Sequence, residues 1–224
     1  MNHLIGLSGR RGSGKDTFLA LLNQQLRALG EAPRYAPMAL ADPLKDMAAV
    51  LTGDDPADFR SQGGKAGYLP AFGMSRGELL QKLGTDCLRV GLMDDVWIRS
   101  LHARRQGVGR VAVTDVRFPN EADYIRAEGG VLIRLEGNPR GLAGDGTRDD
   151  QHPSETSLDD YADFDIVVRN NGSLEQLGLA ARQVAHSLLV GEFASAATVT
   201  IDCAARAMTA GAKPRFLIPG CTLP

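Results

Sequence analysis

Apolar residues recur along the chain with two different periods, and this alternation predicts the order of its elements. A short apolar run at 4–7 breaks into glycine-rich sequence, and apolar residues then recur at helical spacing from 18 to 29. The segment 35–40 favours a second strand, although its proline weakens that prediction. Further strands are predicted at 110–116, 131–135 and 165–172, and further helices at 42–52, 75–90, 94–106, 119–129 and 173–190.

Local signals mark several helix ends. Asp42 is expected to cap the helix that has Pro43 in its first position, and Gly53 is expected to end it. Two serines stand three residues before a Glu or Gln, the spacing of a capping box: Ser75 with Glu78, and Ser173 with Gln176. Strands that alternate with helices predict an α/β fold, with a mainly parallel sheet of about five strands and helices on both faces.

Three segments interrupt this alternation of strands and helices. The stretch 54–74 is rich in Gly, Asp and Pro and is typical of a long surface connection that serves a ligand. The stretch 136–151 is too polar and glycine-rich to be core. From Glu192 onward the pattern is lost: VTIDC and RFLIP could form two extra strands, or the segment could order only against a partner.

Composition and charge narrow the class of protein. With 224 residues, 43% hydrophobic and 23% charged, the chain can form one α/β domain with room for an appendage. A net charge of -2 argues against a nucleic-acid-binding surface. The three cysteines are widely spaced and suggest neither disulfides nor a zinc site, and no leader or membrane span is evident. We therefore expect a soluble cytoplasmic protein.

The segment GLSGRRGSGKDT is close to a phosphate-binding loop. Gly9-x4-Gly14-Lys15 follows a predicted strand and precedes a predicted helix, so glycine backbone N–H groups, the helix N-terminus and the lysine could together hold phosphates. A glycine-rich turn with a solvated lysine is the alternative. The residues expected to bind a nucleotide are Arg11, Gly12, Ser13, Gly14, Lys15, Asp16 and Thr17.

The usual pattern places a magnesium-binding hydroxyl directly after the lysine, where this chain has Asp16. Magnesium prefers oxygen ligands and accepts a carboxylate, so Asp16 could hold the ion directly or through water. The hydroxyl of Thr17 would then contact a phosphate. These residues predict that ATP binds as its magnesium complex, unless Asp16 only caps the helix.

A second acidic position lies at the end of the predicted strand 110–116. Asp115 is placed where open α/β sheets bind ligands, and it could support the metal, act as a base or bind the acceptor. Arg117 and Glu121 follow and could bind substrate, but their spacing also permits a salt bridge without any ligand.

The segments GLSGRRGSGKDT, ADPLK, SRGELLQKLGTDCLR, DDVW, TDVRFPNEADYIRAEGG and HPSET, in this order, resemble the deoxynucleoside monophosphate kinases of bacteriophages. The resemblance covers roughly residues 3–190, and GKDT and DVRFPNE are its most specific parts. Family members share the Asp after the lysine. The resemblance implies a P-loop NTPase-type three-layer fold in which ATP and Mg2+ serve phosphoryl transfer to a deoxynucleoside monophosphate, with a mobile lid.

The resemblance also implies a division of the domain 1–190. The helical insertion 42–105 would bind the acceptor, with Arg76, Gln81 and Arg89 as ligands and Trp97 shaping the base pocket, although Trp97 also fits a core position. The lid would span 136–152, while the extension 191–224 has no assigned role. Because spreading negative charge needs converging arginines, we expect catalytic help from Lys15, Arg134 and Arg140, with Arg148 a further lid arginine.

Some features stay open at this stage. His152 in HPSET is interpreted as structural, because an acceptor phosphate already ionised at neutral pH needs no base. Another small-molecule kinase, similar to phosphomevalonate kinase in its GKD, and a regulatory or packaging-type ATPase are the alternative functions. The accepted bases cannot be read from the chain, and a homodimer is only the commonest default.

Overall fold

The computed structural model describes residues 3–31, 34–139, 141, 149–191 and 198–204. Within these residues six parallel strands form the main sheet, in the order β2-β5-β1-β6-β7-β8. The predicted α/β fold with a mainly parallel sheet is therefore confirmed. The strands are β1 (Leu4–Ser8), β2 (Ala36–Met38), β5 (Val111–Val116), β6 (Val131–Glu136), β7 (Ile166–Arg169) and β8 (Val199–Asp202).

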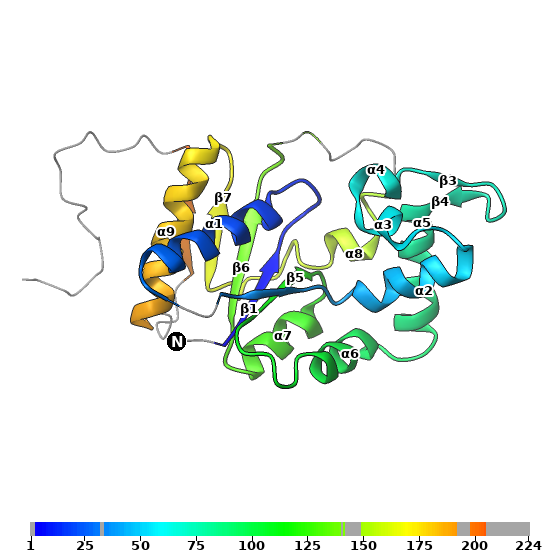
Figure 1. The fold of residues 1–224 in the computed structure, drawn as a ribbon, viewed down its shortest axis with the longest axis horizontal. Helices are drawn as coiled ribbons and strands as arrows, with labels where there is room; N and C mark the ends of the chain where they lie inside the picture. The colour runs from blue at the N-terminus through cyan, green and yellow to red at the C-terminus, as the bar shows by residue number, and fades with distance from the viewer. Residues whose placement is uncertain (1–2, 32–33, 140, 142–148, 192–197, 205–224) are drawn as a thin grey trace, which may run out of the picture.

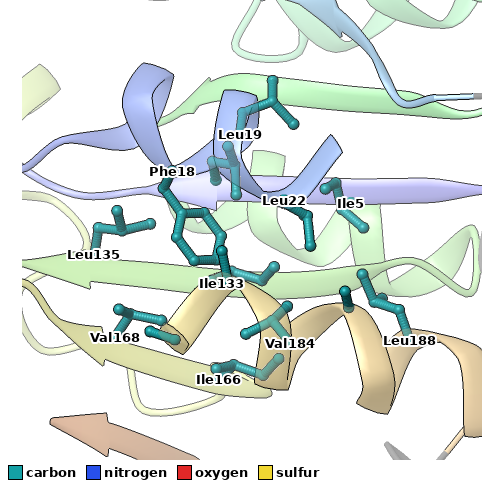
Figure 2. Packing of buried hydrophobic residues seen from close by; sticks show 14 of the residues in the cluster. Ile5, Phe18, Leu19, Leu22, Ile133, Leu135, Ile166, Val168, Val184 and Leu188 are labelled. Atoms are coloured by element: carbon teal, nitrogen blue, oxygen red, sulfur yellow. The ribbon is translucent and has the colours of Figure 1, made fainter. Parts of the chain in front are cut away.

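Helices cover both faces of this sheet. Helices α1 (Lys15–Ala28) and α9 (Leu174–Val190) pack together on one face, at the left of Figure 1. Their leucines and valines meet alternate strand residues such as Ile5 and Ile133, the packing that Figure 2 shows. The strand residues next to these in sequence, such as Leu4 and Leu132, point to the opposite face. There they pack with α6 (Val96–Arg104) and α7 (Pro119–Ala127). This gives the three layers.

The chain between β2 and β5 forms a mainly helical region at the right of Figure 1. It has its own small core of buried residues: Ala48, Ala49, Phe59, Leu69 and Leu79. The stretch 54–74 is therefore more ordered than a surface connection, because Phe59 and Leu69 anchor it. Besides α6, its elements are α2 (Asp42–Thr52), α3 (Pro56–Arg60), α4 (Gln62–Lys65), β3 (Tyr68–Leu69), β4 (Met74–Ser75), α5 (Arg76–Gln81) and the π-helix η1 (Lys82–Val90).

Two local predictions in this region need correction. Asp42 is the first residue of α2 and Ala41 is its N-cap, because the Asp42 carboxylate turns back to accept the N–H of Ala39 at 2.9 Å. The single helix expected at 75–90 continues after α5 as the wider turns of η1. There Gly84 packs against Leu44 of α2, so closely that a Cβ would lie 2.5 Å from its side chain. Both predicted capping boxes and the stop at Gly53 are confirmed.

The sixth strand comes from the C-terminal segment. Val199–Asp202, most of VTIDC, pairs with β7, and Cys203 is buried beside it. RFLIP lies outside the described residues. At the other edge of the sheet, β2 tolerates Pro37 because it pairs with β5 alone. No helix in the described part of the chain is long and apolar enough to cross a bilayer.

Candidate active site

The loop between β1 and α1 has the conformation that its glycines allow. Gly9, Gly12 and Gly14 all have positive φ, at 145°, 80° and 93°. A Cβ on Gly9 would collide with the backbone carbonyl of Leu135 on β6 and lie 2.7 Å from the Ser13 hydroxyl. The loop can therefore lie against β6 only with glycine at this position, and it ends on the first turn of α1.

Lys15 is the first residue of α1, and its side chain folds back over the preceding loop. Its ammonium group donates to the carbonyls of Gly9 at 2.7 Å and Arg10 at 3.1 Å. Burial and, to a smaller extent, the nearby Arg117 guanidinium together lower the pKa of Lys15 to about 8. An anion bound beside Lys15 would stabilise its charged form, so this position favours a phosphate.

One cleft of about 460 Å3 joins this loop to the helical region. Its volume lies within the range of about 300–1,000 Å3 common for small-molecule sites. Six basic side chains and four acidic ones line it among the described residues, so it is locally cationic although the chain is not. The charged lining residues are Arg11, Lys15, Lys45, Arg60, Lys65 and Arg117, with Asp16, Asp42, Asp115 and Glu121.

The remaining loop residues contribute different groups. Gly12, Gly14, Asp16 and Thr17 line the cleft, and the Asp16 carboxylate is exposed in the first turn of α1. Ser13 is buried, and its hydroxyl has no hydrogen-bond partner within the described residues. Arg11 is 5% exposed, with its guanidinium 3.9 Å from Asp150.

Asp115, predicted to bind metal or substrate, lines the cleft at the end of β5. One carboxylate oxygen accepts the N–H of Leu40 at 2.6 Å, and the other accepts the N–H of Ala41 at 3.0 Å. These bonds fix the turn between β2 and α2, which forms another wall of the cleft. Each carboxylate oxygen can accept a further hydrogen bond, which a ligand could donate.

Arg117 borders the cleft on the side of α8 (Pro153–Thr156), a short helix near the sheet in Figure 1. Its guanidinium donates to the Ser154 carbonyl at 2.7 Å and pairs with the Glu155 carboxylate, which is 2% exposed. His152 is the N-cap of α8 and accepts the N–H of Ser154 at 3.2 Å, which fits the structural role expected for it.

Arg89 and Glu121 form an ion pair whose side chains are each 4% exposed. Glu121 also accepts the N–H groups of Arg117 at 2.8 Å and Phe118 at 3.2 Å, while Arg89 lies over the Phe118 ring at 3.9 Å and bonds Asp94 at 2.8 Å. Burial raises the pKa of Glu121 to about 7 against the lowering effect of Arg89. Glu121 reaches the cleft wall, whereas Arg89 does not line it.

Two further predicted substrate ligands line the cleft from the helical region. The Gln81 amide donates to the Asp149 carbonyl at 2.9 Å, which links η1 and α5 to the segment before α8. Trp97 is 7% exposed, and its indole N–H donates to the Gly84 carbonyl at 3.0 Å. Trp97 is thus both a core residue and part of the cleft surface.

Two predicted arginines, Arg76 and Arg134, lie outside the cleft lining. Arg76 does not line the cleft: it bonds Asp54 at 2.7 Å and holds the short elements of the helical region together. Arg134 lies behind the loop, where it donates to Ser8 at 3.3 Å and Asp159 at 3.1 Å, and it lines a smaller cavity. Arg140 lies outside the described residues, as does Arg148.

Sequence reasoning missed several polar cleft residues, four of which lie together on the helical side. Lys45, Arg60, Gln62 and Lys65 come from α2, α3 and α4 and line the cleft opposite the loop. Lys45 pairs with Asp42 at 3.0 Å across one helical turn. Both residues belong to ADPLK, one of the segments on which the family resemblance rests. The other three lie in a stretch interpreted as a surface connection, and no local pattern sets them apart from solvated side chains.

Comparisons with known proteins show which family the chain belongs to. The family model for deoxynucleotide monophosphate kinase matches residues 73–180. A protein of Acanthamoeba polyphaga mimivirus, which carries the provisional name deoxynucleotide monophosphate kinase, is 33% identical over 189 residues, covering 77% of this chain and 91% of its own. The chain belongs to the deoxynucleotide monophosphate kinase family.

Proposed function

We propose that this protein transfers the γ-phosphate of ATP to a deoxynucleoside 5′-monophosphate, giving a deoxynucleoside diphosphate and ADP. The observation that carries the proposal is the single cleft lined at one end by the glycine-rich loop with Lys15 and at the other by basic side chains of α2 to α4. Two nucleotides entering from these ends would meet with their phosphates adjacent. Membership of the family supports the monophosphate acceptor.

The donor side fits a nucleotide triphosphate. Positive-φ glycines let backbone N–H groups turn toward one point, and the N-terminus of α1 adds its partial positive charge there. Ser13 belongs to the same loop. Its buried hydroxyl has no partner among the described residues and would supply a further donor to a phosphate. We assign ATP to Arg11, Gly12, Ser13, Gly14, Lys15, Asp16 and Thr17.

Magnesium fits the acidic groups beside that loop. No group of three or more His, Cys, Asp or Glu that could hold a metal occurs in the described residues, so phosphate and water oxygens would complete its shell. Asp16, exposed at the cleft, would hold the ion. Asp115 would assist through water, since its oxygens already accept two N–H groups. When bound, magnesium neutralises charge on the donor phosphates.

The acceptor side would use the helical region. Lys45, Arg60 and Lys65 offer positive charge to a monophosphate, and Gln81 and Trp97 offer an amide and an apolar surface to a base. Arg76 and Arg89 would then act by supporting this wall, through the ion pairs that hold them.

The chemistry needs positioning more than acid or base catalysis. A monophosphate oxygen attacks the γ-phosphorus of ATP, and the bond from that phosphorus to the β-phosphate oxygen breaks as ADP leaves. Lys15 and Arg117, whose charges lie close enough to affect each other, would face the transferred group from two sides. Glu155 holds the Arg117 guanidinium from α8.

The proposed function also assigns roles to two parts of the domain. We propose that 42–105 is the acceptor-binding insertion and that 136–152 closes as a lid, which would exclude water and limit ATP hydrolysis. Arg140 would enter from that lid, and Arg134 would support the loop from behind through Ser8. A cytoplasmic location and a homodimer stay predictions.

The experiment is an incubation of the purified protein with Mg-ATP and each deoxy- and ribonucleoside monophosphate in turn, with diphosphates separated by ion-exchange chromatography. We expect formation of a deoxynucleoside diphosphate, and loss of at least 100-fold in rate for Lys15→Ala, since electrostatic groups of this type are worth about 2.7–4 kcal/mol. A Lys82→Ala variant, altered on η1 outside the cleft lining, is the matched control.

Two alternative outcomes would refute the proposal. Transfer to phosphomevalonate but to no nucleotide would indicate a different small-molecule kinase. Slow ATP hydrolysis that a protein or DNA stimulates, without any transfer, would indicate a regulatory or packaging-type ATPase.

A further inference from the structure

Asn170 directly follows β7 and reaches the glycine-rich loop from a distant part of the chain. Its side-chain amide donates to the Ser13 carbonyl at 2.9 Å, and both groups are buried. Asn170 itself is 4% exposed. This buried bond ties the loop to the end of β7, 157 positions away along the chain.

The direction of this bond matters for phosphate binding. In a planar trans peptide the C=O of one residue and the N–H of the next point in opposite directions. Because Asn170 holds the Ser13 carbonyl toward the protein interior, the N–H of Gly14 is turned the other way. Gly14 lines the cleft, so an N–H turned away from the interior at this position would face the cleft.

Close packing keeps Asn170 in this position. Its backbone N–H donates to the Glu136 carbonyl at the end of β6, at 2.7 Å. On one side, a Cβ on Gly14 would lie 2.5 Å from the Asn170 amide nitrogen; on the other, a Cβ on Gly137 would collide with the Asn170 carbonyl. Both glycines have positive φ, so the three residues fit together only in this arrangement.

We propose that Asn170 is a positioning residue for the donor triphosphate, which it serves by orienting the Gly14 N–H without touching the nucleotide. This inference rests on the proposed function, in which the loop binds ATP. It predicts an effect on the donor side only, because no contact of Asn170 reaches the acceptor wall among the described residues.

The next residue offers a matched control. Asn171 is exposed, and its side chain accepts the N–H of Ala204 at 2.9 Å, beyond β8 and away from the loop. Asn170→Ala and Asn171→Ala therefore remove the same chemical group from adjacent positions. Asn170→Asp keeps the size of the side chain but replaces the amide donor by a carboxylate facing a carbonyl.

The test measures the dissociation constants of Mg-ATP and Mg-ADP by titration calorimetry, together with KM for each substrate. We expect Asn170→Ala and Asn170→Asp to weaken nucleotide binding about 10-fold, the usual cost of leaving one buried hydrogen-bonding group unpaired. KM for the monophosphate should change less than twofold, and Asn171→Ala should bind both nucleotides as the wild type does. Lowering the pH should partly restore Asn170→Asp, because a protonated carboxyl can donate again.

The outcomes separate the two proposals. If the wild-type protein binds neither nucleotide, the proposed function fails and this inference fails with it. If the wild type binds but both Asn170 variants bind equally well, only the inference is refuted. An equal rise in both KM values, accompanied by a lower melting temperature and no recovery of Asn170→Asp at low pH, would also refute it, because that result describes a purely structural asparagine.

Discussion

The buried pair of Arg89 and Glu121 decides whether Arg89 binds substrate or supports the fold. Replacing Arg89 by Met keeps the length of the side chain but leaves the Glu121 carboxylate, 4% exposed, without its guanidinium. Breaking a buried pair from one side costs about 3–5 kcal/mol. Loss of the cation over the Phe118 ring at 3.9 Å adds to this cost. We therefore expect Arg89→Met to lower the free energy of unfolding by at least about 3 kcal/mol.

The loss should depend on pH in a defined direction. Burial raises the pKa of Glu121 to about 7 while Arg89 is present, and removing Arg89 raises it further. A carboxyl group whose folded pKa is raised contributes stability that is present at low pH and lost as pH rises through that pKa. The penalty of Arg89→Met should therefore be larger at pH 8 than at pH 5.5, where the carboxyl group is protonated and needs no cation.

The assay is urea unfolding followed by circular dichroism at both pH values, with two comparison variants. Arg99→Met removes an exposed pair with Asp95 and should leave stability within experimental error. The double variant Arg89→Met/Glu121→Gln should recover part of the loss, since it removes both charges. Equal losses for Arg89→Met and Arg99→Met would refute the reasoning. Unchanged stability with a raised KM for the monophosphate would instead make Arg89 a ligand, as the sequence first indicated.

Two further predictions concern the cleft itself. Asp16→Ala should raise the magnesium concentration needed for half-maximal rate several-fold, because it removes an exposed carboxylate from the donor side. An unchanged magnesium titration would leave Asp16 only as an acidic residue in the first turn of α1, whose N-cap is Gly14. Glu155→Gln should lower the transfer rate about 10-fold, because it removes the buried carboxylate that holds the Arg117 guanidinium. A wild-type rate in Glu155→Gln would show that Arg117 needs no such anchor.

Features with a local cause were predictable from the sequence. The change from a strand run to helical spacing around Gly9 and Lys15 located the loop, because each period reflects one element. The boxes beginning at Ser75 and Ser173 predicted the starts of α5 and α9, since three residues suffice to form them. These signals need no knowledge of the rest of the chain.

Features made by distant contacts were not predictable. Asp115 bonds Leu40 and Ala41, some 75 residues away, and its position at a strand end suggests a ligand just as well as an anchor. Asn170 bonds Ser13 across 157 positions, and its own segment resembles an ordinary turn. The strand at Val199–Asp202 was one of two alternatives for its segment, because a short and mostly exposed strand carries too little pattern to decide between them until β7 provides a partner.

The two sides of the cleft depend on separate supports, which fits the proposed division between a donor side and an acceptor side. The loop is held from behind by strand ends, through Leu135 of β6 and Asn170 after β7. The opposite wall rests on its own core around Phe59, and Leu80 and Leu83 join that core to the one beneath α6 and α7. Substitutions behind the loop should therefore act on the donor, and substitutions in the helical core on the acceptor. Leu80 and Leu83 contact both cores, so substitutions there should affect the donor side and the acceptor side together.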